Sequence, residues 1–267
     1  MKRILLSVLP LLTVVVLLLP GAAQAKVPLS SSCYPTHCYG IVDFNAGTFA
    51  FLGMQTKDSV RGLGLGGNTK FLTNEEWLAD TITYKPNIGP WVEAGYGMGL
   101  NTVNTMCGYN ESFFWADFRE NGGGFHIHCP AYVGSGDYGY NVVDKISQSS
   151  TDASAWNVTI TPHSSTQITG QSTNNTMYPN DAEFGEELSA TDGGQGVNAP
   201  RTTFTSNSYE DLNGNWHFWH NPPYAWTIDL PGLPNDPPYA GWVNGEDPNH
   251  DSTGGKLYAC TVGTSSC

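Results

Sequence analysis

The sequence predicts an all-β fold, a sandwich or jelly roll of two antiparallel sheets. Its composition is short of the residues that fill helices: of 267 residues, 31 are Gly, 17 are Pro and only 13% are charged. Thr, Tyr, Trp and Phe, which favour strands, are plentiful. Aromatic residues make up 12% of the chain. That content argues against disorder of the Gly-, Asn- and Ser-rich stretches, so we expect a packed interior.

The first 25 residues have the pattern of a secretory signal peptide. Two basic residues precede an apolar run that ends at Leu19, and the segment closes with the small-residue sequence A-Q-A. We therefore expect cleavage after Ala25 and a secreted product, residues 26–267, with an uncleaved membrane anchor as the alternative. No later apolar run is long enough to span a bilayer.

The expected mature chain is strongly acidic. Loss of Lys2 and Arg3 from the eleven Lys and Arg leaves nine against 24 Asp and Glu, a formal charge of −15. Such a chain lacks the basic surface that attracts nucleic acid or anionic lipid. We therefore expect neither nucleic acid nor, after signal cleavage, a membrane as partner, and we expect a monomer.

Residues 26–267 are predicted to form a single domain. Short stretches rich in β-branched and aromatic residues recur between turn residues, as is typical of a sandwich. The predicted strands span residues 47–52, 91–96, 112–118, 125–129, 156–161, 182–188, 216–219 and 226–230. An N-terminal arm (26–40) precedes them. The Pro-rich stretch 221–248 is punctuated by aromatic residues, so we expect an ordered surface excursion.

Two local predictions concern the middle of the chain. The segments S-F-F-W-A-D-F (112–118) and F-H-I-H-C (125–129) are joined by R-E-N-G-G-G, whose glycines permit the positive φ of a hairpin connection. A short helix is expected at T-N-E-E-W-L (73–78), because Thr73 would cap a first turn that carries two acidic residues.

All six cysteines follow the expected cleavage site, in a chain directed to an oxidising compartment. Six cysteines allow 15 connectivities. Sequence spacing favours the pairs Cys33 with Cys38, Cys107 with Cys129, and Cys260 with Cys267. No C-x-x-C pair indicates a cysteine metal site.

Two acidic strand segments could carry chemistry. In W-V-E-A-G-Y, alternation places Glu93 on one strand face with Trp91 and Gly95, so the carboxylate lies beside an indole and a space left by glycine. In A-E-F-G-E-E-L, Glu187 shares its face with Gly185. Burial of either carboxylate would raise its pKa. The alternative for each is an ordinary acid on a half-exposed strand.

These segments resemble motifs of the glutamic peptidases. E-A-G-Y (93–96) resembles the E-A-G-W motif of the neprosin family, and F-G-E-E-L (184–188) resembles that family's W-G-G-E-V. F-F-W (113–115), followed by a turn and a cysteine, resembles the family's aromatic strand. A-E-F-G-E-E is also similar to A-E-W-I-V-E of the fungal eqolisins, and this match selects the same Glu187. The resemblance covers roughly residues 40–190, and the eqolisin Q-T-G motif has no good counterpart.

The resemblance implies a concanavalin-like sandwich whose concave groove holds Glu93 and Glu187 as the catalytic pair. Two facing carboxylates cannot both ionise cheaply, so such a pair shares a proton over a range of pH. The ionised member can activate water against a peptide carbonyl that the protonated member polarises. We therefore expect an endopeptidase active at acidic pH, without cofactor or metal, and the neprosin preference for cleavage after proline is one option. The residues expected to bind the polypeptide substrate are Trp91, Tyr96, Trp115 and Asp117.

Three other interpretations remain open. A jelly-roll glycoside hydrolase could apply the same pair to a polysaccharide, with carboxyls about 5 Å apart in a retaining enzyme and about 6.5–9.5 Å apart in an inverting one. A non-catalytic carbohydrate-binding module would use exposed Trp and Tyr as stacking platforms, and glutamates far apart would favour it. A metal could bind His126 with His128, or His217 with His220, although hydrogen-bonded histidines are the default.

Overall fold

The computed structural model describes most of the chain between residues 37 and 261. The described residues are 37–45, 50–80, 89–119, 124–190, 197–219, 226–228, 242–246 and 256–261. Within these ranges the chain is almost entirely β-strand, with a single 3-10 turn, η1 (Leu100–Thr102). No helix of the described residues is long and apolar enough to cross a membrane. The predicted signal peptide, residues 1–25, and most of the N-terminal arm lie outside the described residues.

Fifteen strands follow one another along the described chain. They are β1 (Cys38–Asn45), β2 (Gly53–Ser59), β3 (Thr69–Ala79), β4 (Trp91–Met98), β5 (Ser112–Arg119), β6 (Gly124–Tyr132), β7 (Asn141–Gln148), β8 (Trp156–Thr161), β9 (Ile168–Ser172), β10 (Asp181–Ala190), β11 (Thr202–Glu210), β12 (Trp216–Phe218), β13 (Trp226–Ile228), β14 (Trp242–Glu246) and β15 (Lys256–Thr261).

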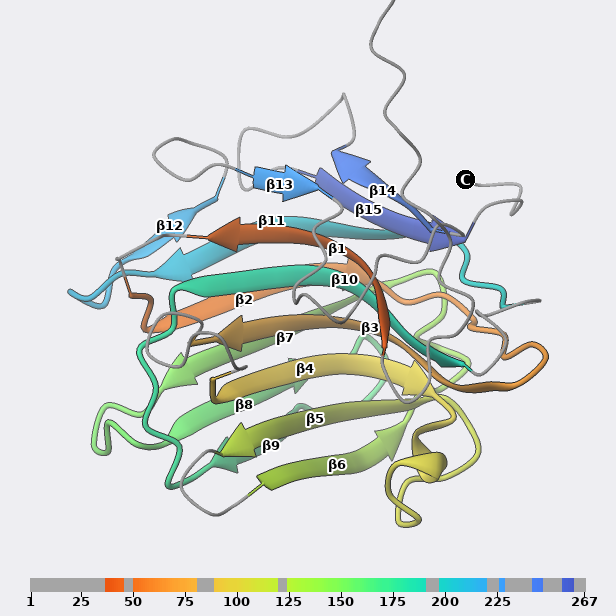
Figure 1. Ribbon diagram of the computed structural model, residues 1–267, viewed down its shortest axis with the longest axis horizontal. Helices are drawn as coiled ribbons and strands as arrows, with labels where there is room; N and C mark the ends of the chain where they lie inside the picture. The colour runs from red at the N-terminus through yellow and green to blue at the C-terminus, as the bar shows by residue number, and fades with distance from the viewer. Residues whose placement is uncertain are drawn as a thin grey trace, which may run out of the picture.

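The strands form two antiparallel sheets that lie one behind the other (Figure 1). The seven-stranded sheet has the order β13-β1-β10-β3-β4-β5-β6, and the eight-stranded sheet has the order β14-β15-β11-β2-β7-β8-β9, with β12 paired to β11. Non-consecutive neighbours such as β10 and β3 are typical of a jelly roll. The predicted fold class, an all-β jelly-roll sandwich of two antiparallel sheets, is therefore confirmed.

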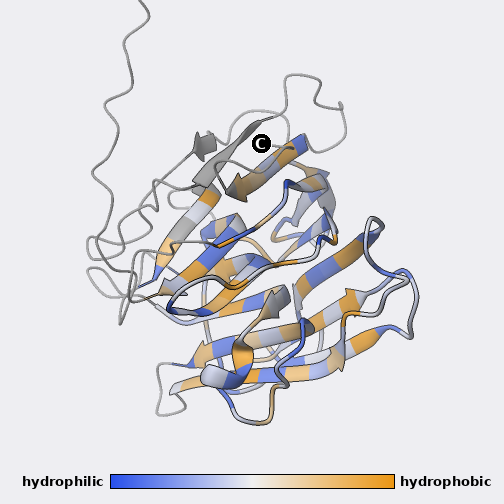
Figure 2. Cartoon of the chain, turned by 90° about the vertical axis from the view of Figure 1, so that its right-hand side faces the viewer, coloured by the Kyte–Doolittle hydropathy of each residue, from blue (hydrophilic) through white to orange (hydrophobic). Residues whose placement is uncertain are grey.

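The main core fills the space between the sheets. Leu78, Tyr96 and Phe184 of the seven-stranded sheet pack in one cluster with Met54 and Ile146 of the eight-stranded sheet, and all five are buried. Apolar and polar residues alternate along many of the strands (Figure 2). This period of two turns one set of side chains toward the core and the other set outward.

Four carboxyl groups are also buried between the sheets. Glu76 and Glu186 lie on the inner face of the seven-stranded sheet, opposite Asp58 and Asp144 of the other sheet, and each is 0% exposed. Burial raises the pKa of all four groups, and the charge of Asp144 raises the pKa of Asp58 and Glu76 further. The interior therefore accommodates these carboxyls best when they are protonated.

The helix predicted at residues 73–78 is wrong, because this segment lies in strand β3. β3 pairs with β10 on one side and β4 on the other, so it is a central strand of the seven-stranded sheet. Its residues are buried from Phe71 to Ala79 on both faces. A strand buried on both faces shows no simple alternation of apolar and polar residues, and sheet pairing overrides the capping signal at Thr73.

Most of the predicted strands are present. The hairpin of residues 112–118 and 125–129 is confirmed as β5 paired with β6. The described part of the predicted strand 47–52 instead lies in the connection that precedes β2. In the Pro-rich stretch 221–248, the described residues form β13 and β14, one in each sheet.

The disulfide predicted between Cys107 and Cys129 is confirmed. Cys38 and Cys260 are also disulfide-bonded. The cysteines predicted to pair with them, Cys33 and Cys267, lie outside the described residues.

Candidate active site

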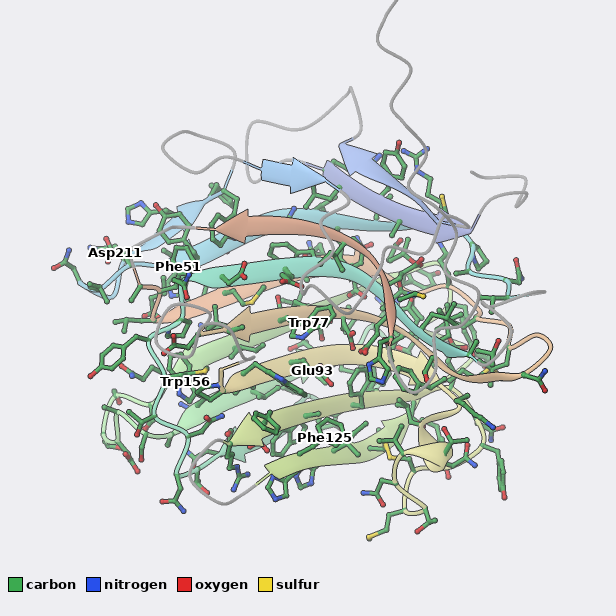
Figure 3. The ribbon with its side chains drawn as sticks, viewed as in Figure 1. Phe51, Trp77, Glu93, Phe125, Trp156 and Asp211 are labelled. Carbon is green, nitrogen blue, oxygen red and sulfur yellow. A yellow bond between two sulfur atoms is a disulfide. The ribbon has the colours of Figure 1, made fainter. Side chains whose placement is uncertain are left out.

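Three glutamates from adjacent strands converge on the outer face of the seven-stranded sheet. Glu187 lies on β10, Glu75 on β3 and Glu93 on β4. One carboxylate oxygen from each lies within 4.8 Å of one from each of the others. All three are buried, with exposures of 6%, 1% and 5% respectively. Figure 3 marks Glu93 near the middle of the sheet. The predicted pair, Glu93 and Glu187, is thus brought together.

The register explains why the three carboxyls meet. Glu75 pairs across the ladder with Gly185 on one side and Gly95 on the other, so no neighbouring side chain stands beside it in its row. Glu187 lies one row away opposite Thr73, and Glu93 lies one row away in the other direction opposite Trp77. The carboxylates of Glu187 and Glu93 therefore approach that of Glu75 from diagonal positions on its two sides.

Gly95 leaves no room for a larger residue. A Cβ atom at this position would lie 2.1 Å from the Asn74 carbonyl oxygen and 2.9 Å from the Glu75 Cβ. A side chain would therefore displace strand β3 at the residue that carries the central carboxylate. The glycine shapes the site by permitting close approach of the two strands.

Burial and neighbouring carboxylates raise the pKa of two of the three carboxyls. The pKa of Glu93 is raised well above its usual value by burial, then by the charges of Glu187 and Asp117. Burial also raises the pKa of Glu75, with further contributions from the charges of Glu93 and Glu187. Such a cluster loses its protons stepwise as a unit, and it keeps at least one proton well above the range of an isolated glutamate.

A histidine from the start of β1 touches this cluster. Nδ1 of His37 is ion-paired with Oε1 of Glu187. The imidazole packs edge-on against Phe71, with ring centroids 5.0 Å apart, and the His37 side chain is 37% exposed. One end of the carboxylate cluster therefore carries a basic group.

An apolar surface flanks the carboxylates toward β6. A second hydrophobic cluster contains Phe114, Ala116 and Ile127, together with Leu100 of η1. Ala116 and Ile127 lie in the same cross-strand row as Glu93. The acidic centre thus adjoins a buried apolar cluster on the same face of the sheet.

Trp91 is the one predicted substrate-binding residue that shares a face with Glu93. It lies two residues before Glu93 on β4. Its ring stacks with Phe118 at a centroid distance of 6.3 Å and lies tilted against Phe125 at 5.6 Å.

The structure places Tyr96, Trp115 and Asp117 on the inner face of the sheet, opposite to the face that carries Glu93. The Tyr96 hydroxyl donates to the Ser59 carbonyl and accepts from the Arg61 amide, deep in the core. Trp115 packs on Gly170, and Asp117 is 0% exposed. Their positions alternate with the outward-facing residues, so they face the second sheet.

The candidate metal histidines have other partners. His126 bonds Asp117 at 2.9 Å, and His128 stacks on Trp115 with centroids 4.0 Å apart. His217 bonds Asp211 at 2.8 Å, while His220 lies outside the described residues. Within the described ranges, the side chains close enough to share a metal ion are again the three glutamates of the carboxylate cluster. Carboxylate oxygens suit a hard divalent cation.

Sequence reasoning missed Glu75 and His37. Glu75 was assigned to a helix, because the strand that carries it is buried on both faces and shows no simple alternation of apolar and polar residues. His37 carries no local signal, because its partner Glu187 lies 150 positions away in the sequence. Only the pairing of β1 with β10 brings them together.

The structure is similar to scytalido-glutamic peptidase. A crystal structure of that peptidase with a transition state analog inhibitor matches at a TM-score of 0.55 and 12% identity, over 84% of this chain and 98% of that one. A second, with a peptide-based transition state analog, matches at 0.51 and 11% over the same shares. At these identities the likeness shows the fold alone.

A glycoside hydrolase family 16 endo-glucanase from Bacteroides ovatus matches much less well. Its TM-score is 0.32 at 9% identity, over 58% of this chain and 69% of that one, which supports no functional argument. No family model and no curated protein matches the sequence. The resemblance to neprosins therefore stays a prediction.

Proposed function

We propose that this protein is a glutamic endopeptidase that hydrolyses polypeptides at acidic pH. The observation that carries the proposal is the convergence of Glu93 and Glu187, which were predicted as a pair from two separate motifs, at one buried outer-face site. The sandwich that presents them has the fold of a known glutamic peptidase. We further propose, from the sequence, that the enzyme is secreted after removal of residues 1–25.

The site contains the groups that peptide hydrolysis requires. One carboxylate takes a proton from a water molecule, whose oxygen attacks the carbonyl carbon of the scissile bond. A protonated carboxyl donates its proton to the carbonyl oxygen and so stabilises the tetrahedral intermediate. Transfer of a proton to the leaving nitrogen then breaks the carbon–nitrogen bond, and a hydroxyl of the intermediate returns a proton to the carboxylate that donated one, giving an acid and an amine. The two carboxyls end with their proton count restored.

Acidic pH follows from the shared protons. Both chemical roles need a cluster that is partly protonated, and burial with mutual repulsion raises the pKa of Glu93 and Glu75. Activity should therefore rise when the first carboxylate forms and fall when the last proton leaves, giving a bell-shaped profile.

The test is peptide cleavage by the two glutamine variants. Glu93→Gln and Glu187→Gln should each lower kcat by at least about a hundredfold on a denatured protein at acidic pH, while the far-UV spectrum stays unchanged. The matched control is Glu183→Gln on the same strand as Glu187, which should keep near-normal activity. Full activity in either glutamine variant at the site would refute the proposal. Sequencing the products would show whether cleavage follows proline.

The same assay decides the alternative of a glycoside hydrolase. The three oxygens lie within 4.8 Å, a short separation that also suits a retaining glycosidase. Xylan and mixed-linkage glucan should therefore be incubated beside the protein substrate. Release of sugar without release of peptide, lost in Glu93→Gln, would replace the peptidase proposal. A non-catalytic carbohydrate-binding module was expected to have Glu93 and Glu187 far apart. The structure instead brings their carboxylates together.

A further inference from the structure

Strand β1 places His37 at the carboxylate cluster. It immediately precedes Cys38, which is fully buried, disulfide-bonded and paired with Leu188. Because Cys38 and Leu188 face inward, alternation turns residue 37 to the outer face, where Glu187 lies. The imidazole meets Oε1 of Glu187 and is held from the side by Phe71. The contact between His37 and Glu187 thus depends on the pairing of β1 with β10 and on the packing of the imidazole against Phe71.

The surroundings of Glu187 differ from those of the other two glutamates. Glu187 is approached by Glu75 from β3, by Glu93 from β4 and by His37 from the start of β1. Glu93 has the charges of Glu187 and Asp117 near it, and Glu75 has those of Glu93 and Glu187. Among the described residues, the basic side chain His37 therefore contacts Glu187. The charges that raise the pKa of Glu93 and Glu75 come from other carboxylates.

A neighbouring cation decides which carboxyl of a coupled cluster ionises first. Histidine side chains ordinarily titrate near pH 6.5 and glutamates near pH 4.3, at about these values in model peptides. A carboxylate in contact with a histidine favours the protonated form of that histidine, so the two charged forms stabilise each other. An imidazolium beside one carboxyl lowers the free energy of that carboxylate relative to its neighbours.

We propose that His37 is a positioning residue that makes Glu187 the ionised general base and leaves the shared protons on Glu93 and Glu75. This inference rests on the proposed peptidase function, whose two roles it assigns. In the reaction, Glu187 accepts a proton from the attacking water. Glu93 donates its proton to the carbonyl oxygen, and the proton gained by Glu187 passes to the leaving nitrogen. As the carbon–nitrogen bond breaks, the hydroxyl formed on the carbonyl oxygen returns its proton to Glu93.

The first experiment measures kcat and KM against pH for His37→Gln and His37→Lys. The acidic limb of kcat reports protonation of the base. Without the cation, His37→Gln should move that limb upward by about one pH unit, and should lower kcat about tenfold below the midpoint, with KM changed less than about threefold. His37→Lys restores a positive charge and should return the limb toward its original position. The control, His163→Gln, alters a histidine that stacks on Tyr140 and should leave the profile unchanged.

The outcomes separate this inference from the proposed function. Loss of activity in Glu187→Gln together with an unmoved limb in His37→Gln would overturn the role of His37 and leave the peptidase standing. Higher activity in His37→Gln at all pH values would also overturn it, because His37 would then block Glu187. An active Glu187→Gln would refute both.

A second measurement needs no His37 variant to fold. Carboxyl ¹³C resonances of glutamate-labelled native protein, assigned with Glu187→Gln and Glu93→Gln, give the order in which the carboxyls ionise. The Glu187 resonance should titrate at least about one pH unit below that of Glu93. Ionisation of Glu93 first would overturn the inference.

Discussion

We expect the free energy of unfolding to fall as pH rises from acidic to neutral, and replacing Asp144 with asparagine should reduce this fall. Asp144 is 0% exposed between the two sheets, on the strand next to the one that carries Asp58. Burial raises the pKa of Asp144 from 3.8 to about 7. An unfolded chain solvates this carboxylate freely, so ionisation favours unfolding.

The sign and the magnitude follow from that shift. Because the pKa in the folded state is raised, the stabilisation is fully present below the unfolded value of 3.8 and is lost as pH rises through about 7. Each pH unit of difference corresponds to about 1.4 kcal/mol, so Asp144 alone accounts for about 4 kcal/mol. A domain is typically stable by only about 5–15 kcal/mol. Because Asp58, Glu76 and Glu186 are shifted in the same direction, the native protein should be less stable at neutral than at acidic pH.

The assay is urea unfolding, followed by tryptophan fluorescence, at several pH values between about 3.5 and about 7.5, the window set by the shifted carboxyl. The amide introduced by Asp144→Asn cannot ionise, so the variant should lose about 4 kcal/mol less than the native protein across this range. The control is Asp152→Asn, because that carboxylate lies on an exposed turn and bonds Ser154. Its stability should follow the native curve.

Two results would refute the reasoning. The first is a native protein whose free energy of unfolding is constant or rises between acidic and neutral pH. The second is an Asp144→Asn variant that loses stability as steeply as the native protein.

Three further predictions concern the site and the fold. Gly95→Ala should lower both the melting temperature and kcat, because its Cβ would lie 2.1 Å from the Asn74 carbonyl oxygen; normal values of both would contradict the tight packing. Tyr96→Phe should cost about 1 kcal/mol of stability through its lost hydrogen bonds and leave kcat and KM unchanged, as calorimetry and kinetics can show. Replacing Cys107 and Cys129 together by serine should cost about 3 kcal/mol by chain entropy for a separation of 22 residues, and an unchanged urea midpoint would argue against it.

The sequence determined the class of fold and two of the three site glutamates. Composition argued against a mainly helical fold, because a chain rich in Gly, Pro and aromatic residues fits turns and strands. Glu93 and Glu187 each share a strand face with a glycine two positions away, and this pattern can be read from a few consecutive residues. The pairing of Cys107 with Cys129 could also be predicted locally, because the two cysteines are only 22 positions apart and Cys129 lies in the second strand of the predicted hairpin.

The tertiary structure alone decided which strand face carries the site. Alternation separates Trp91 and Glu93 from Tyr96, but it does not say which set faces the second sheet, so Tyr96 was assigned to substrate. Glu75 and His37 were out of reach for a related reason. β3 is buried on both faces and lacks a periodic signal, and the contact of His37 with Glu187 exists only through the pairing of β1 with β10. Local sequence fixes the side-chain period of a strand, while its neighbours and buried face depend on contacts between residues far apart in the chain.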